Sequence, residues 1–195
     1  FAASTYLNPS ERLASFGSSG LRWRWNLSTG SPFDHWGVAV ARKVDASAVG
    51  RVDIVAAWSS AARGTCGLTG LSSVSPSNRS RWAYTLDDCN AVPGTKGLKV
   101  AAMSDDASTV AFGVWAANTT APALHVLDAQ SGTLLWIYTL DGGHDHMHVD
   151  LSRAGAQILL PFGPTLRVRE RASGKLRAPP IDMGAAFSAD LCPMG

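Results

Sequence analysis

The chain has 195 residues, of which 46% are hydrophobic and 16% are charged, and its formal net charge at pH 7 is +2. This composition excludes a disordered polyelectrolyte, and the scattered lysines and arginines form no basic block of the kind that binds nucleic acid. No apolar run reaches the roughly 18 residues needed to cross a bilayer, so we expect no membrane span. The 19 glycines and 10 prolines favour turns and short strands over long helices.

The chain opens with three predicted strands. The runs at 2–7, 11–16 and 21–27 read as the last three strands of a four-stranded meander whose first strand is missing. The sequence begins at Phe1, with neither an initiator methionine nor a leader-like segment. We therefore expect a processed product or a piece of a longer protein.

Three further units follow, and each reads as four strands joined by turns. β-branched, aromatic or apolar runs alternate with turn sequences such as Ser104-Asp-Asp-Ala-Ser108, whose aspartates we interpret as turn residues. The predicted strands are 36–41, 51–58, 68–75 and 81–86, then 98–103, 109–115, 123–128 and 133–140, then 146–151, 157–162, 165–170 and 175–181. The run at 185–191 resembles another first strand. Helical periodicity is absent, so the sequence predicts an all-β protein.

One phrase recurs at the end of successive units. It reads Arg-Trp-Arg-Trp-Asn-Leu at 22–27, Arg-Trp-Ala-Tyr-Thr-Leu at 81–86 and Leu-Trp-Ile-Tyr-Thr-Leu at 135–140. Four-stranded antiparallel units that repeat every 40 to 60 residues or so are the signature of β-propeller blades. The predicted blade pieces are 1–27, 36–86, 98–140, 146–181 and 185–191.

The segment 124–136 resembles the repeat of quinoprotein-alcohol-dehydrogenase-like (PQQ-like) β-propellers. Asp128, Ala129, Gly132 and Trp136 occupy the places of that repeat's Asp-Ala, turn glycine and tryptophan. The segment 166–175 resembles it in part, with Ala178 where the tryptophan belongs. WD40-type propellers share the general pattern.

The resemblance implies that Trp23, Trp82 and Trp136 are structural and pack between neighbouring blades. The family's enzymes hold pyrroloquinoline quinone (PQQ) and calcium beside two adjacent cysteines, and this sequence has no such pair. We therefore expect no PQQ and no confidently assigned cofactor.

Two architectures agree with the strand count, which equals four complete blades. In one, the run at 185–191 pairs with the first three strands and closes a small ring, which removes the free sheet edges. In the other, which we favour, the chain is a window from a larger seven- or eight-bladed propeller.

The sequence His144-Asp-His-Met-His148 is the strongest local candidate for chemistry. On a strand, His144, His146 and His148 share one face, and neutral imidazole binds divalent metals such as zinc or copper. The outer two would lie about 14 Å apart on an extended strand, so three ligands would require a bend at Gly142-Gly143. The alternative is a loop whose histidines bond to neighbouring residues.

Three N-x-[ST] sequons, at Asn26, Asn78 and Asn118, favour a glycoprotein that is secreted or lies in the lumen of the secretory pathway. Cys66 and Cys89 flank a predicted outer hairpin and form a candidate disulfide, and the alternative is two buried thiols. Cys192 has no partner in this predicted pairing.

We find no sequence pattern for hydrolytic catalysis, such as a Gly-x-Ser-x-Gly elbow, and we assign no catalytic residue. His35 and His125 are expected on blade surfaces, and the run 167–171 is expected to form a solvated outer strand face. The sequence favours a non-catalytic propeller scaffold that binds a protein or small ligand through its loops. The alternative is a quinoprotein-type oxidoreductase or a metal-dependent enzyme that uses the His144–His148 cluster.

Overall fold

The computed structural model describes the backbone of part of the chain. The described residues are 2–3, 12–17, 20–26, 36–40, 51–60, 64–72, 80–87, 97–115, 122–139, 149–162 and 164–183. Side chains are described for residues 51–58, 64–72, 80–87, 102–114, 122–139, 149–161 and 164–183.

The described secondary structure consists of antiparallel strands, as the sequence predicts. They form four sheets, which we name A (β1–β3), B (β4–β7), C (β8–β11) and D (β12–β15), each an up-and-down meander. The bounds are β1 Ala2–Ala3, β2 Arg12–Gly17, β3 Gly20–Asn26, β4 Trp36–Val40, β5 Ile54–Ser60, β6 Thr65–Leu71, β7 Trp82–Leu86, β8 Gly97–Met103, β9 Thr109–Trp115, β10 Ala123–Asp128, β11 Leu134–Thr139, β12 Asp150–Leu151, β13 Gln157–Phe162, β14 Thr165–Glu170 and β15 Ile181–Asp182.

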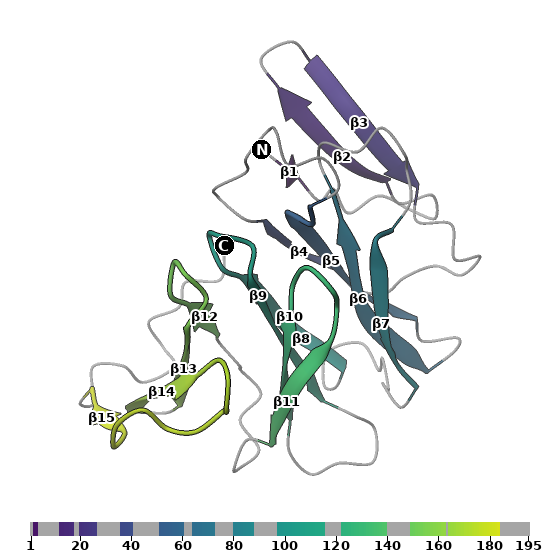
Figure 1. Ribbon diagram of the computed structural model, residues 1–195. Helices are drawn as coiled ribbons and strands as arrows, with labels where there is room; N and C mark the ends of the chain where they lie inside the picture. Colours follow the sequence, from purple (N-terminus) through teal and green to yellow (C-terminus); the bar gives the residue numbers. More distant parts are fainter. Residues whose placement is uncertain are drawn as a thin grey trace.

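The first strands of the sheets lie next to one another, and the sheets spread outward from them (Figure 1). β8 lies beside β4 on one side and beside β12 on the other, and β1 contacts β4. Each of sheets B, C and D therefore has an inner strand near its neighbours and an outer strand at the rim. This radial arrangement is that of propeller blades.

Sheet C lies between sheets B and D and is buried on both faces. Neighbouring side chains of a strand point to opposite faces, so they enter different cores. Val110 and Phe112 of β9 enter a core shared with sheet B, whereas Ala111 between them enters a core shared with sheet D. The same split places Leu127 toward sheet B and Val126 toward sheet D. A strand covered on both faces needs an almost continuous hydrophobic run, which explains the composition of β9 and β10.

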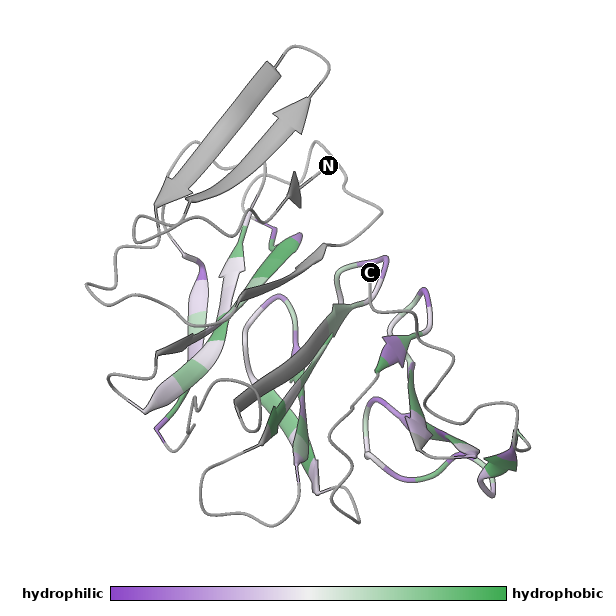
Figure 2. Ribbon diagram, turned by 180° about the vertical axis from the view of Figure 1, so that it is seen from behind, coloured by the Kyte–Doolittle hydropathy of each residue, from purple (hydrophilic) through white to green (hydrophobic). Residues whose placement is uncertain are grey.

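Hydrophobic residues accordingly follow the strands between sheets, while the turns at their ends are mostly hydrophilic (Figure 2). The core between sheets B and C contains Val52, Val55, Ala57, Cys66, Leu68, Val110, Phe112, Val114, Leu127 and Ala129. The core between sheets C and D is smaller, and it contains Ala111, Leu124, Val126, Ile158 and Leu160.

The outer strand of sheet D is shorter than predicted. Instead of a strand over 175–181, Leu176 makes an isolated bridge to Arg169, and β15 pairs only Ile181 and Asp182 with β14. Pro179 and Pro180 lie between these two points and lack the N–H that a strand ladder requires. The predicted strand over 68–75 is also misplaced, since β6 begins at Thr65, where it pairs with Ser60.

No helix in the described part of the chain is long and apolar enough to cross a membrane. Residues 185–191 lie outside the described residues. The pairing of that run with sheet A, and with it the choice between a closed ring and a window, stays a prediction.

Candidate functional site

Trp82 joins sheet B to sheet C through a turn backbone. Its indole Nε1 donates a hydrogen bond of 2.9 Å to the carbonyl oxygen of Ala129. Its ring lies against Gly132, where an added Cβ would stand only 2.6 Å from Trp82 Cδ2. Gly132 has φ +72°, a conformation that glycine adopts at little cost. The tryptophan therefore docks onto a turn that only glycine fits.

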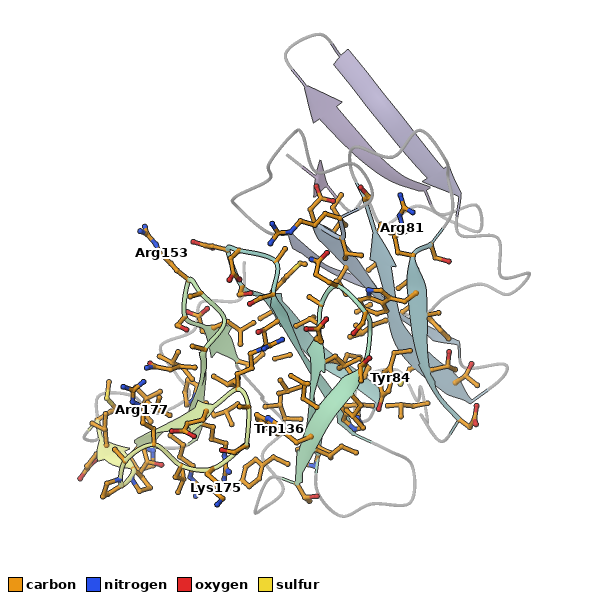
Figure 3. The ribbon with its side chains drawn as sticks, viewed as in Figure 1. Arg81, Tyr84, Trp136, Arg153, Lys175 and Arg177 are labelled. Atoms are coloured by element: carbon orange, nitrogen blue, oxygen red, sulfur yellow. The ribbon has the colours of Figure 1, made fainter. Side chains whose placement is uncertain are left out.

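Trp136 repeats this contact between sheets C and D. Its Nε1 donates to the carbonyl oxygen of Arg171 at 2.6 Å, and its ring lies against Gly174, at φ +65°. Figure 3 shows Trp136 on β11 at the boundary with sheet D. The predicted structural role is confirmed for Trp82 and Trp136, whereas the side chain of Trp23 lies outside the described residues.

A tyrosine two residues after each tryptophan makes a second contact to the next sheet. Tyr84 Oη lies 2.9 Å from Nδ1 of His125, and Tyr138 Oη accepts a 2.7 Å hydrogen bond from Arg167. His125 and Arg167 hold equivalent places, each seven residues before the turn glycine of its sheet. The two sheets therefore present a partner for the tyrosine at the same position, which is a histidine in sheet C and an arginine in sheet D.

The prediction of His125 as a surface residue is wrong. The side chain is only 6% exposed and packs edge-on to Phe112 at a centroid distance of 6.0 Å. Burial lowers the pKa of His125 to about 4, and it raises the pKa of Tyr84. At neutral pH both groups are uncharged, and the tautomer of the imidazole decides which of the two donates the hydrogen bond.

The prediction of 167–171 as a solvated face is also wrong for its arginines. Arg167 bonds to Tyr138, and the guanidinium carbon of Arg169 lies 3.5 Å from the centroid of the Tyr138 ring. Arg171 donates to Asp128 at 2.7 Å and to the carbonyl oxygen of Ser108. These three side chains hold sheet D against sheet C.

The turns that join strands one to two and three to four lie at one end of the sheets. We call this end the turn face, and it comprises residues 104–108, 128–133, 152–156 and 170–175 (Figure 1). Asp106 N donates to the carbonyl oxygen of Arg153, and Thr109 Oγ1 donates to that of Gly155. Neighbouring turns are therefore joined across the C–D boundary by hydrogen bonds.

Carboxylates stabilise these turns. Burial alone would raise the pKa of Asp106, but hydrogen bonds from Ser104 and Ser108 and the charge of Arg51 outweigh it, so the pKa is lowered. The pKa of Asp128 is lowered in the same way: burial opposes the shift, and hydrogen bonds from Ser131 and Gln130 with the charge of Arg171 outweigh it. The prediction that Asp105-Asp106 forms a turn is confirmed.

Gln130 supplies a further link across the B–C boundary at this end. Its amide accepts from Val52 N at 3.1 Å and donates to Val52 O at 2.8 Å. It also donates to the carbonyl oxygen of Ala107. No pattern in the sequence distinguishes this glutamine from other turn residues, so sequence reasoning does not find it.

The predicted metal ligands His144, His146 and His148 lie in the β11–β12 connection, outside the described residues. Among the side chains that the structure describes, no three His, Cys, Asp or Glu residues gather as a metal site. Asn78, Asn118 and Cys89 also lie outside the described residues, and of Asn26 only the backbone, at the end of β3, is described. Cys66 is disulfide-bonded, but its partner lies outside the described part, so the Cys66–Cys89 pairing stays a prediction.

Similarity to solved structures identifies the fold. The Dos1 propeller aligns with a TM-score of 0.53 and 11% identity over 89% of this chain and 43% of that one. KlAtg21, solved in complex with the coiled-coil of AgAtg16, aligns at 0.54 and 10% identity over 83% and 47%. The dihydro-heme d1 dehydrogenase NirN, solved in complex with DHE, aligns at 0.52 and 14% identity over 93% and 35%.

No family model matches the chain, and the search of curated proteins finds no match. The chain spans less than half the length of each of these three solved chains. The sheets and the similar structures together define the fold class as an all-β propeller.

Proposed function

We propose that the chain is a non-catalytic propeller scaffold that binds a protein, or another ligand, through the loops at one end of its sheets. The observation that carries this proposal is the turn face. Turns of sheets C and D are linked there by hydrogen bonds from Asp106 and Thr109, and Gln130 links this end to Val52, which precedes β5 of sheet B. Loops held on a rigid frame are the usual place for recognition.

The side chains that this face exposes are mostly polar and of mixed charge. Arg153 is 94% exposed, and Asp105 lies 3.7 Å from it. Gln130, Ser131 and Lys175 are exposed on the neighbouring turns. Such a surface, with hydroxyl, amide and charged groups, complements a polar protein surface better than it complements an apolar small molecule.

The polar groups between the sheets support a structural rather than a catalytic role. Tyr84 pairs with His125, and Tyr138 contacts Arg167 and Arg169. Arg171 pairs with Asp128. Each of these groups already bonds to a neighbouring sheet, as expected for residues that fix a unique packing. KlAtg21 offers a precedent for a propeller that binds a protein segment.

Affinity purification with the intact chain as bait, followed by isothermal titration calorimetry on a purified partner, tests this proposal. We expect Arg153→Glu combined with Ser131→Arg to weaken binding about tenfold, since each change reverses or adds charge at the turn face. Thr85→Glu is the matched control, because Thr85 is exposed on β7. Equal affinity for the turn variant and the wild type would contradict the proposal.

We also propose that the blades are of the PQQ-like type. The contacts made by the residues that carry the resemblance support this proposal. Asp128 accepts hydrogen bonds from Gln130 N and Ser131 N, Gly132 receives Trp82, and Trp136 reaches the next sheet. The full-length protein's sequence provides the test, since further copies of Asp-Ala-x-x-Gly with a tryptophan four residues later should recur at blade spacing.

The alternative function is an oxidoreductase of the quinoprotein type or a metal-dependent enzyme that uses His144, His146 and His148. Three imidazoles at alternate positions favour it. Calorimetric titration with Zn²⁺, Cu²⁺ and PQQ distinguishes the two functions. Stoichiometric binding that is abolished by His146→Ala would support the enzyme function. The absence of binding would favour the scaffold function.

Secretion and glycosylation stand as a further proposal, carried by the sequons at Asn26, Asn78 and Asn118. Treatment of the secreted protein with peptide N-glycosidase should lower its mass in steps that correspond to the occupied sites. Peptide mapping of the same sample without reduction would identify the partner of Cys66.

A further inference from the structure

Large hydrophobic side chains are exposed in two outer regions of the described chain. The five that are exposed among the described residues are Leu134, Leu135, Ile137, Leu176 and Ile181. Three of them lie on β11, the outer strand of sheet C, and Ile137 is 51% exposed. Apolar side chains gathered on one strand differ from the scattered ones that every protein surface carries.

β11 is also a sheet edge. In the four-stranded order β11-β10-β9-β8 it pairs with β10 alone, and among the described strands none lies on its other side (Figure 1). The register shifts between Val126 and Leu127, so the pairing is regular from Trp136 to Thr139. An edge strand presents N–H and C=O groups at alternate residues that are free to pair with another strand.

The outer strand of sheet B holds the same position but is protected. Arg81 of sheet B corresponds to Leu135 of sheet C, and Ala83 on β7 corresponds to Ile137. Arg81 directly precedes β7, and a charged residue at the start of an edge strand discourages pairing with other chains. The sequence Leu134–Thr139 contains no charge, no proline and no glycine, which makes it a favourable partner for another strand.

We infer that β11 is a self-association edge, at which two copies of this chain pair in an antiparallel, twofold arrangement. A free backbone edge is complemented by an extended strand, and an uncharged, largely apolar strand is complemented by one of the same kind. β11 is itself such a strand. A twofold axis between two β11 strands places uncharged residues opposite one another, without like charges. This inference does not depend on the proposed function.

The contact is small, and this sets the concentration at which it forms. A single strand edge buries less than the roughly 1,200–2,000 Å² of a stable interface, so the dimer is weak. We expect a dissociation constant in the range of about 10 μM to 1 mM. Measurements therefore have to cover that range.

Sedimentation equilibrium of the intact chain from about 5 μM to 1 mM tests the inference. The weight-average mass should rise from the monomer value of 20.5 kDa toward twice that value. Ile137→Lys should raise the dissociation constant at least about tenfold, because it places a charge on each side of the twofold axis. Ala83→Lys, the same change at the equivalent exposed position of β7, should leave it unchanged.

Two further measurements separate edge pairing from other causes. Ile181→Lys, at an exposed apolar residue of sheet D, should not weaken association if β11 is the contact. Far-UV circular dichroism and urea midpoints should show that all three variants fold. A constant monomer mass, growth beyond the dimer without a plateau, or equal effects of Ile137→Lys and either control would overturn the inference.

Discussion

The B–C and C–D boundaries share one backbone contact but surround it with different side chains. In both, a tryptophan donates to a turn carbonyl and packs on a glycine at positive φ. Around it, the B–C boundary has a large apolar core and a partly buried Tyr84–His125 pair. The C–D boundary instead has Arg167 and Arg169 at Tyr138, and Arg171 paired with Asp128. The same tryptophan contact therefore joins both pairs of sheets, while different side chains complete the packing around it.

Damage to the apolar core at the B–C boundary should destabilise the chain most. Phe112→Ala should lower the free energy of unfolding by about 3–5 kcal/mol, because it leaves a cavity where the largest fully buried side chain of the described residues stood. Leu160→Ala, in the smaller C–D core, should cost less. Urea denaturation measures both, and a larger loss for Leu160→Ala would reverse our ranking of the two boundaries.

Acid should destabilise the B–C boundary through His125. The pKa of His125 is about 4 in the folded chain and 6.5 in the unfolded chain. As the pH falls, the unfolded chain therefore binds the proton at a higher pH than the folded chain does. Stability is therefore full above pH 6.5, falls between pH 6.5 and 4, and is lower by about 3 kcal/mol below that window.

Thermal unfolding across this pH window tests the expectation, with His125→Gln as the comparison. The variant should show a much flatter profile from pH 6.5 to 4. Asp106 and Asp128 have lowered pKa values, so their contribution is lost below the window rather than within it. An unchanged slope in His125→Gln would show that another group titrates.

The shared tryptophan contact can be broken at its glycines. Gly132→Ala and Gly174→Ala should each cost about 2–3 kcal/mol, since the new Cβ meets the indole and the backbone has positive φ. Gly64→Ala is the control, because it has φ +63° but no atom closer than 4.0 Å to the added Cβ. It should cost only about 1 kcal/mol. Equal losses of stability at all three glycines would show that backbone strain alone accounts for the effect, without a contribution from the tryptophan contact.

The smallest effect concerns the ion pair of the C–D boundary. Arg171 and Asp128 are each about one-third exposed, so their coupling should be about 0.5–1 kcal/mol in a double-mutant cycle and should weaken in high salt. A coupling above about 2 kcal/mol would mean that the arginines, and not the tryptophan, hold sheet D.

Strand positions were largely predictable, because alternating apolar runs and turn sequences mark them. The strands 109–115, 123–128, 157–162 and 165–170 agree with the structure. The side-chain environments were not predictable to the same degree. A polar residue that alternates with apolar ones reads as solvent-facing, yet His125 faces sheet B and Arg167 faces sheet C, because a neighbouring sheet covers that face of the strand. The predicted site at His144–His148 lies outside the described residues, so the structure does not test it.

The tryptophan contact also has a direction. Sheet B reaches into sheet C and sheet C reaches into sheet D, but sheet D has Ala178 where its own tryptophan would stand. Each tryptophan contact therefore runs from a sheet to the sheet that follows it in the chain. Among the described residues, two tryptophan contacts hold sheet C and one holds sheet D. Amide hydrogens of β13 and β14 should therefore exchange before those of β9 and β10, and opening should begin at sheet D.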